Sequence, residues 1–244
     1  MPTIQTKDLA IYYETKGEGS PVLYFSGTGG DLRTKPNLLD GPLPNSMHTI
    51  TYDQRGLGQT EKPEGPYTMA QYADDAAHLL DALGFDRVNV IGVSFGGMVA
   101  QHFALRHADR VEKLVLCCTS AGGDSPSYPF HELPADITAV ERARLMMGIS
   151  DLRCDEEWQA SNADKVEAML NYTKEHAIAD HQTPEFKRGA NLQLLARADH
   201  DVTQRLDEIN MRTLLCAGKY DGIAPAANQD FLLENLPNAK LEWF

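Results

Sequence analysis

Short runs of hydrophobic residues alternate along the chain with longer segments in which hydrophobic residues recur every three or four positions. The short runs are candidate β-strands, at residues 9–15, 22–26, 49–53, 88–93, 113–118, 213–217 and 240–244. Four of them are continuously apolar, which is typical of strands buried on both faces of a parallel sheet. The alternation of strand and helix predicts an α/β fold, a mostly parallel sheet flanked by helices and built from right-handed crossovers. A short Gly-rich connection joins the first two candidate strands, so we expect an antiparallel hairpin at one edge of the sheet.

The segment after residue 67 carries the signals of both ends of a helix. Thr68 and Gln71 have the spacing of a capping box, and Gly84 stands where a helix often ends in a glycine. Between them the hydrophobic residues fall on one helical face, at Tyr72, Ala76, Leu79, Leu80 and Leu83. The pattern predicts an amphipathic helix between Thr68 and Gly84.

Residues 125–188 differ in character from the rest of the chain. Two proline-containing loops, 125–134 and 183–184, flank helical patterns at 135–147 and 163–179, and no good strand pattern occurs there. We interpret 125–188 as a helical lid inserted between two strands, over one end of the sheet. Residues 1–124 and 189–244 would then form the core.

Composition and charge narrow the function classes. The 244 residues are 42% hydrophobic and 23% charged, as in ordinary globular proteins, and the net charge of −13 argues against nucleic-acid partners and anionic membrane surfaces. No apolar run reaches the length of a membrane span, and the first residues lack a signal-peptide pattern. Three of the four cysteines lie in apolar runs, which favours reduced, buried thiols. We therefore expect a cytoplasmic protein.

The strongest chemical signal is the sequence Gly92-Val93-Ser94-Phe95-Gly96, between a candidate strand and a helical pattern at 97–107. This is the strand–turn–helix context of a nucleophile elbow, in which a strained serine needs small residues two positions away on either side. A dinucleotide-binding fingerprint is disfavoured. Its middle glycine is Ser94 here, and the next strand ends in Cys117-Cys118-Thr119 without an acidic residue.

Two further elements fit acyl-transfer chemistry. Residues 25–30, Phe-Ser-Gly-Thr-Gly-Gly, follow a strand, so Thr28 could supply one backbone N–H to a developing oxyanion and Phe95 the other. Asp221 follows the strand at 213–217 and could orient an imidazole. Taken separately, the first element could be an ordinary glycine turn and Asp221 a solvated turn residue.

With these elements the chain resembles the α/β-hydrolase fold family, of the esterase, lactonase and cofactor-free haloperoxidase-like type, along essentially its whole length. Residues 53–60, Asp-Gln-Arg-Gly-Leu-Gly-Gln-Thr, are similar to the D-x-R-G-x-G-x-S loop common in that family. The resemblance implies Ser94 as nucleophile, Asp221 as the orienting acid, and Thr28 and Phe95 as the oxyanion hole. Ser26 replaces a histidine usual in that loop, which leaves the backbone donor intact. We assign Asp53 and Arg55 to holding their loop.

The resemblance also implies a catalytic histidine shortly after the strand at 240–244, and the sequence ends at Phe244. None of the eight histidines has the expected place in the order of the motifs. His102 and His107, like His176 and His181, are five residues apart, which argues against a shared metal site on one helical face. We expect His200 to belong to an exposed turn, and His131 is the one histidine that could reach the site from the lid.

We therefore expect a parent chain that continues beyond Phe244 to the histidine, and weak or no activity in the 244 residues alone. A natural protein that has lost the base and only binds a small ligand is the alternative.

The sequence predicts a serine hydrolase that cleaves a small carboxylic ester or lactone through an acyl-enzyme on Ser94. Hydrolysis of a carbon–carbon or amide bond, or perhydrolase chemistry, on the same residues is the alternative. No metal or organic cofactor is implied, the expected partner is a small-molecule substrate, and the oligomeric state is not readable. Candidates for the acyl pocket are lid residues, namely Tyr128, Phe130, Met146, Met147 and Trp158.

Overall fold

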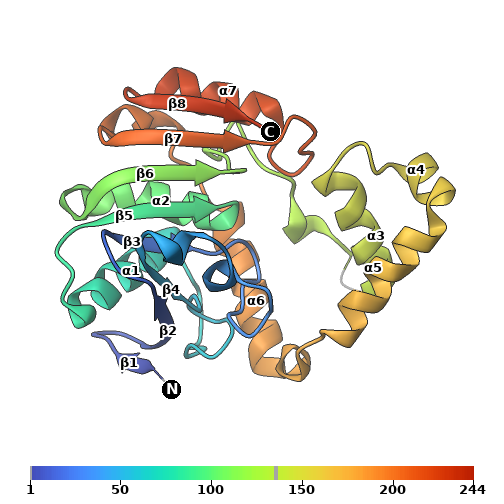
Figure 1. Ribbon diagram of the computed structural model, residues 1–244, viewed down its shortest axis with the longest axis horizontal. Helices are drawn as coiled ribbons and strands as arrows, with labels where there is room; N and C mark the ends of the chain where they lie inside the picture. The colour runs from blue at the N-terminus through green and yellow to red at the C-terminus, as the bar shows by residue number, and fades with distance from the viewer. Residues whose placement is uncertain (1, 135–136) are drawn as a thin grey trace.

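A computed structural model describes residues 2–134 and 137–244, and its centre is one sheet of eight strands (Figure 1). The strand order across the sheet is β1-β2-β4-β3-β5-β6-β7-β8. The strands are β1 (Thr3–Gln5), β2 (Ala10–Lys16), β3 (Pro21–Phe25), β4 (His48–Tyr52), β5 (Val88–Val93), β6 (Val111–Cys117), β7 (Arg212–Ala217) and β8 (Ala239–Trp243). The helices are α1 (Met69–Leu83), α2 (Phe95–Arg106), α3 (Ala139–Ser150), α4 (Glu156–Ser161), α5 (Ala163–Glu175), α6 (Pro184–Ala198) and α7 (Ala226–Asn235).

The sheet is parallel from β4 to β8, and only β1 and β2 run antiparallel to their neighbours. Helix α2 packs against β3, β5 and β6, α1 packs against α2, and α7 packs against β7 and β8. The central strands carry fully buried side chains such as Leu23, Phe25 and Val90, as their continuous apolar runs predict. The predicted α/β fold class, a mostly parallel sheet flanked by helices, is confirmed.

The predicted hairpin between the first two candidate strands is wrong. Strand β2 pairs with β4 instead, with Tyr13 opposite Tyr52, and β3 lies between β4 and β5. A Cβ on Gly17, whose φ is +87°, would lie 2.2 Å from the backbone oxygen of Pro44. The glycine-rich link between β2 and β3 therefore packs closely against the segment that leads into β4. The hairpin is formed by β2 with β1, a strand of three residues that has no apolar run to predict it.

The helix predicted between Thr68 and Gly84 is confirmed as α1. The Thr68 side chain accepts a hydrogen bond from Gln71 N, the Gln71 side chain accepts one from Thr68 N, and Gly84 ends the helix with a φ of 77°. The left-handed conformation at Gly84 is the one that glycine adopts without a steric penalty.

The predicted loop at residues 183–184 is instead the start of α6. The Thr183 side chain accepts a hydrogen bond from Phe186 N. Pro184 occupies the first turn, where a backbone N–H would have no acceptor within the helix, so proline is tolerated there. Helix α6 therefore crosses the predicted boundary between residues 188 and 189. Two other predicted helices differ in their bounds. The pattern at 163–179 gives α5, which ends at Glu175, and the pattern at 135–147 gives α3, which begins at Ala139, while residues 135–136 lie outside the described residues.

Helices α3, α4 and α5 lie beyond the carboxyl ends of the parallel strands, on the right of Figure 1. Two hydrogen bonds tie α3 and the residues after it to the loop that follows β7, from Gly222 N to Ile149 O (2.9 Å) and from Leu152 N to Tyr220 O (2.8 Å). In the part of the chain that the structure describes, no helix is both long and apolar enough to cross a membrane.

Candidate active site

Ser94 lies in the sharp turn between β5 and α2, with a φ of 54° and a ψ of −117°. A Cβ on Gly92 would lie 2.3 Å from Gly96 O, and a Cβ on Gly96 would lie 2.1 Å from Phe25 O. Neither position admits a side chain without backbone movement. The two glycines therefore allow the turn, and a backbone in this region stores on the order of 1–3 kcal/mol of strain.

Contacts to the end of β6 hold the strained serine in place. Ser94 N donates to Cys117 O (2.8 Å), and Thr119 Oγ1 donates to Ser94 O (2.8 Å). A Cβ on Gly97 would lie 2.6 Å from the Thr119 side chain, so α2 also packs closely against this residue. Helix α2 begins directly after Ser94, two residues earlier than the hydrophobic pattern predicts, because the elbow leads into the helix without a loop.

The loop 26–30 lies beside the elbow, since a Cβ on Gly27 would be 3.7 Å from the Ser94 Cβ. The two N–H groups predicted to form an oxyanion hole, those of Thr28 and Phe95, donate no hydrogen bond to any residue that the structure describes. The Phe95 N–H is at the first position of α2, where backbone donors have no partner within the helix. Both N–H groups therefore lack an acceptor among the described residues.

Two glutamines that the sequence does not reveal as functional hold this loop. Gln193 on α6 accepts a hydrogen bond from Gly29 N (2.8 Å) and donates to the Gln54 side chain (3.4 Å). Gln54 in turn donates to Ser26 O (2.8 Å). Both side chains are fully buried, so their hydrogen bonds are not shared with solvent. No local motif marks Gln193, because its partners lie in distant parts of the chain.

Asp221 lies in the loop after β7, at the same edge of the sheet as Ser94. Its Oδ1 accepts hydrogen bonds from Ile223 N (2.7 Å) and Ala224 N (3.0 Å), and no backbone N–H of the described residues donates to Oδ2. Cys118, directly after the intervening β6, is its neighbour: burial raises the pKa of the Cys118 thiol, and the charge of Asp221 and a side-chain hydrogen bond to it add to the rise. The backbone thus fixes the Asp221 carboxylate at Oδ1, and Oδ2 has no backbone donor among the described residues.

Asp53 holds the loop 53–60 from within. It accepts hydrogen bonds from Leu32 N (2.7 Å) and Gln59 N (2.8 Å). Burial raises the pKa of Asp53 to about 6, although these two N–H groups oppose the shift. Arg55 makes a two-bond ion pair with Asp75 of α1 (2.8 and 2.7 Å). The contacts of Asp53 and Arg55 are those of residues that position a loop.

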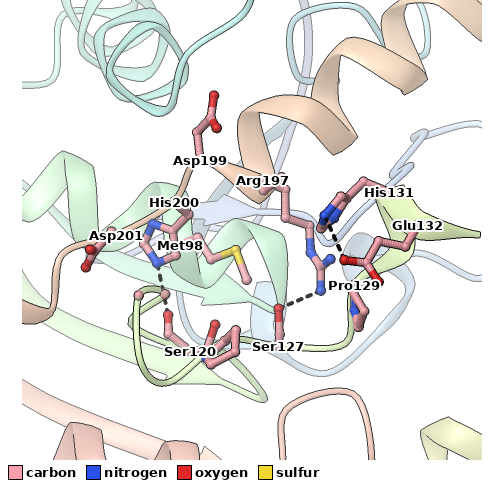
Figure 2. A pocket seen from close by; sticks show the side chains of 14 residues that line it. Met98, Ser120, Ser127, Pro129, His131, Glu132, Arg197, Asp199, His200 and Asp201 are labelled. Carbon is pink, nitrogen blue, oxygen red and sulfur yellow. Dashed lines mark hydrogen bonds and ion pairs between the residues drawn. The ribbon is translucent and has the colours of Figure 1, made fainter.

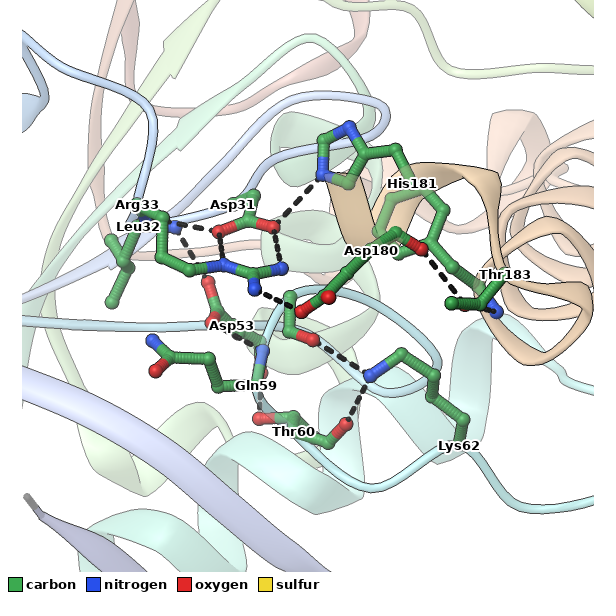
Figure 3. Close-up of polar contacts among 12 residues, drawn as sticks. Asp31, Leu32, Arg33, Asp53, Gln59, Thr60, Lys62, Asp180, His181 and Thr183 are labelled. Carbon is green, nitrogen blue, oxygen red and sulfur yellow. Dashed lines mark hydrogen bonds and ion pairs between the residues drawn. The ribbon is translucent and has the colours of Figure 1, made fainter. Parts of the chain in front are cut away.

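A network of charged side chains joins the segment after loop 26–30 to residues 180–181, which precede α6 (Figure 3). Asp31 binds Arg33 (2.7 Å) and His181 (2.9 Å), and Arg33 also binds Asp180. Burial alone would raise the pKa of Asp31, but the hydrogen bonds from Arg33 and His181 outweigh it, and the pKa is lowered. Residues 31–33 and 180–181 are therefore held together at the base of the insertion.

The expectation that His200 lies in an exposed turn is wrong. Its side chain is buried, with 3% of the residue exposed, and it bonds to His102 (3.1 Å) and to Ser120 O (3.1 Å). Because Ser120 O can only accept, His200 Nε2 carries the hydrogen, and His200 Nδ1 accepts from His102 Nε2. His107, the residue that ends α2, binds Asp74 of α1 (2.8 Å). Among the described residues, no histidine forms a hydrogen bond with Ser94 or Asp221.

A pocket of about 800 Å³ opens beside the loop 26–30, with Thr28, Gly29 and Gln193 in its wall. Of the predicted pocket residues Phe130 lines it, together with Phe186 and Leu194 of α6. Four other predicted lining residues are absent from its wall: Tyr128, Met146, Met147 and Trp158. Tyr128 packs on Phe130 and Trp158 lies against Lys165, so contacts within the insertion account for these two side chains.

Comparison with known proteins agrees with this geometry. Residues 20–145 match the family model described as alpha/beta hydrolase fold. A poly(3-hydroxyalkanoate) depolymerase of Ectopseudomonas oleovorans is 29% identical, over 91% of this chain and 75% of its own. A 2-hydroxymuconate semialdehyde hydrolase of Pseudomonas putida is 28% identical, over 100% of this chain and 86% of its own.

Solved structures share the fold. The crystal structure of the enol-lactonase from Burkholderia xenovorans LB400 aligns with a TM-score of 0.78 at 24% identity, covering 100% of this chain and 91% of that one. The strained serine after β5, the parallel sheet and the matching family model lead to one conclusion: the chain belongs to the α/β-hydrolase fold family, and the curated relatives that it matches include hydrolases.

Proposed function

We propose that the protein is a serine hydrolase that cleaves a small carboxylic ester or lactone through an acyl-enzyme on Ser94. The observation that carries the proposal is the elbow itself, where Ser94 has a φ of 54° between two glycines that admit no Cβ. A strained serine between two free backbone N–H groups is an arrangement suited to acyl transfer.

The reaction uses these groups in order. Ser94 Oγ attacks the carbonyl carbon and gives its proton to a general base, for which the family resemblance implies a histidine held by Asp221. The Thr28 and Phe95 N–H groups bind the oxyanion of the tetrahedral intermediate. Asp221 Oδ2, which has no backbone donor among the described residues, accepts the hydrogen bond of the imidazole Nδ1–H and fixes its tautomer. Collapse expels the alcohol, protonated by the imidazolium, and water then hydrolyses the acyl-enzyme by the same steps.

The pocket beside Thr28 would hold the substrate. Its volume of about 800 Å³ is within the range of small-molecule sites, and Phe130, Phe186 and Leu194 supply apolar walls for an acyl chain. Residues 125–188 act as the lid in this proposal. The hydrogen bonds from Gly222 N to Ile149 O and from Leu152 N to Tyr220 O would couple lid movement to the Asp221 loop.

Carbon–carbon bond hydrolysis on the same residues is the second candidate. The support for it is the 28% identity to the semialdehyde hydrolase, which extends over 100% of this chain. The oxyanion donors and the acid would be the same, so the substrate separates the two candidates.

The test is a substrate panel on the complete gene product. We expect wild type to hydrolyse p-nitrophenyl acetate or butyrate, or a γ- or δ-lactone, and Ser94→Ala to lose the activity by at least about 10⁴-fold. Ser20→Ala, which changes an exposed serine in the loop before β3, should behave as wild type. Activity that survives in Ser94→Ala, or its absence from the whole panel in wild type, would overturn the ester and lactone assignment.

A further inference from the structure

A second pocket, of about 530 Å³, lies beside helix α2 (Figure 2). Met98 of α2, Pro126 and Pro129 give it apolar walls, and Arg197 from the last turn of α6 points into it. Residues 130–132 separate it from the pocket at Thr28, since His131 lines both. Neither Ser94 nor Asp221 lines either pocket, and of the two only the pocket at Thr28 has a wall in the loop 26–30 beside Ser94.

Arg197 is a buried cation with an incomplete set of partners. Only 5% of the residue is exposed. Its guanidinium donates to Tyr128 O (2.7 Å) and to Ser127 Oγ (2.6 Å), both of them neutral acceptors, and lies 4.7 Å from the centre of the Phe130 ring. No carboxylate of the described residues lies within ion-pair distance of it, and the buried Nε–H has no partner there. Burial lowers the pKa of Arg197 to about 10, which reflects the missing negative charge.

The other arginine buried in the described part of the chain shows the contrast. Arg55 is 8% exposed and meets both oxygens of Asp75. Buried charges in proteins are almost always paired in this way, because an unpaired one loses its hydration without compensation. A buried guanidinium that faces a cavity and lacks a carboxylate therefore indicates that the negative charge comes from a ligand.

The remaining charges around the pocket limit what that ligand can be. Glu132, Asp199 and Asp201 line the pocket but are exposed, and none of them pairs with Arg197. Asp201 accepts hydrogen bonds from Thr203, and Glu132 lies 3.7 Å from His131. One guanidinium can balance one negative charge, and the surrounding carboxylates repel a second. The pocket therefore favours a monoanion over a dianion such as phosphate. A planar carboxylate matches the donor fork of arginine, and the apolar walls suit a short hydrocarbon body.

We propose that this pocket is a binding site for a small organic monocarboxylate, whose carboxylate pairs with the Arg197 guanidinium through its terminal N–H groups and whose hydrocarbon part lies against Met98, Pro126 and Pro129. The site is separate from the pocket of the proposed hydrolysis, and binding here does not depend on Ser94 being reactive.

The test compares carboxylates with their uncharged amides. Butyrate and benzoate, and in parallel butyramide and benzamide, are titrated into the complete protein by calorimetry at constant pH and ionic strength. We expect wild type to bind each acid at least about tenfold more tightly than its amide, because charge-assisted bonds to a desolvated guanidinium are stronger than those to a neutral amide. The Arg197 Nε–H resonance should shift on addition of butyrate, because a bound carboxylate places a negative charge beside the guanidinium.

Two variants complete the test. Arg197→Met removes the donor fork and should abolish the preference for acids, while Arg205→Gln, which changes an exposed arginine in the segment Thr203–Glu208, should retain it. Equal affinity of wild type for acids and amides, an unmoved Nε–H resonance, or an unchanged preference in Arg197→Met would each overturn the proposal, whether or not Ser94 proves reactive.

Discussion

The side chains of Gln193 and Gln54 meet in the core at 3.4 Å, although 139 residues separate them in the sequence. Together they join α6, which continues from the insertion, to both Ser26 and Gly29 of the loop beside Ser94. The position of the proposed oxyanion donor at Thr28 therefore depends on a helix that the sequence places partly in the lid. This relationship leads to the first prediction.

Gln193→Ala should lower kcat for ester hydrolysis by about tenfold with little change in KM. The Gly29 N–H loses its acceptor, so the Thr28 N–H is held less firmly where the oxyanion develops; complete loss of a donor costs about 10²–10³. Steady-state kinetics of the complete protein check this, with Gln204→Ala, an exposed glutamine, as control. An unchanged kcat would mean that the glutamine pair has only a structural role.

Gly96→Ala should destabilise the fold by more than about 2 kcal/mol, because the new Cβ would lie 2.1 Å from Phe25 O and overpacking of this kind costs typically 1–3 kcal/mol. Gly148→Ala is the matched control: in the interior of α3 the new Cβ would meet its nearest atoms at 3.4 Å. There alanine should stabilise by about 0.5–1 kcal/mol. Urea denaturation of both variants gives the comparison, and similar effects of the two substitutions would contradict the steric account.

The stability of the protein should fall on acidification through the buried pair His102 and His200. Burial lowers the pKa of His102 to about 4 and that of His200 to about 3. An unfolded histidine has a pKa of about 6.5, so below that pH the unfolded state binds more protons than the folded one. The stabilisation is complete above pH 6.5 and is lost as pH falls towards the folded pKa values, by about 2 kcal/mol per histidine between pH 7 and pH 5.

Substitution separates this effect from that of the carboxylates. His102→Gln keeps a donor for His200 Nδ1 and removes one titrating group, so its loss of unfolding free energy between pH 7 and pH 5 should be about 2 kcal/mol smaller than that of wild type. His176→Gln, on an exposed residue after α5, should lose as much as wild type. Equal losses in wild type and His102→Gln would rule out the buried histidine as the cause.

Asp75→Asn should cost about 3–5 kcal/mol, because it leaves the Arg55 guanidinium buried without its counter-charge. The neighbouring Asp74 pairs with Arg106 at the surface, where the two side chains are 32% and 41% exposed. Asp74→Asn should therefore cost about 1 kcal/mol or less. Thermal unfolding of the two variants is the measurement, and a comparable drop in both would show that the Arg55–Asp75 pair does not anchor the loop 53–60.

The parts of the fold that the sequence predicts are those with a local signal. The parallel strands show as apolar runs, α1 shows through the capping residues Thr68 and Gln71, and the elbow at Ser94 shows through glycines two residues away. Each of these depends on neighbours within a few positions, so a single sequence is enough to locate it.

The parts that the sequence mispredicts depend on distant contacts. Strand β2 pairs with β4, which lies more than thirty residues further along the chain. The buried side chain of His200 bonds to His102, which is 98 residues away in the sequence. Thr183-Pro184 fits a loop or a helix start equally well, and only the packing of α6 on the loop at Gly56 distinguishes them. A Cβ on Gly189 would lie 2.0 Å from Gly56 O. Gln193 and Arg197, on the same helix, have no local pattern that marks them.

The central claim is that Ser94 is a reactive nucleophile, and covalent labelling tests it most directly. The complete gene product is treated with a fluorophosphonate and its intact mass is measured, followed by peptide mapping, with Ser94→Ala and Ser20→Ala in parallel. The account predicts a single adduct on Ser94 in wild type and in Ser20→Ala, and none in Ser94→Ala. A complete protein that takes up no adduct, or an adduct that persists in Ser94→Ala, would contradict it.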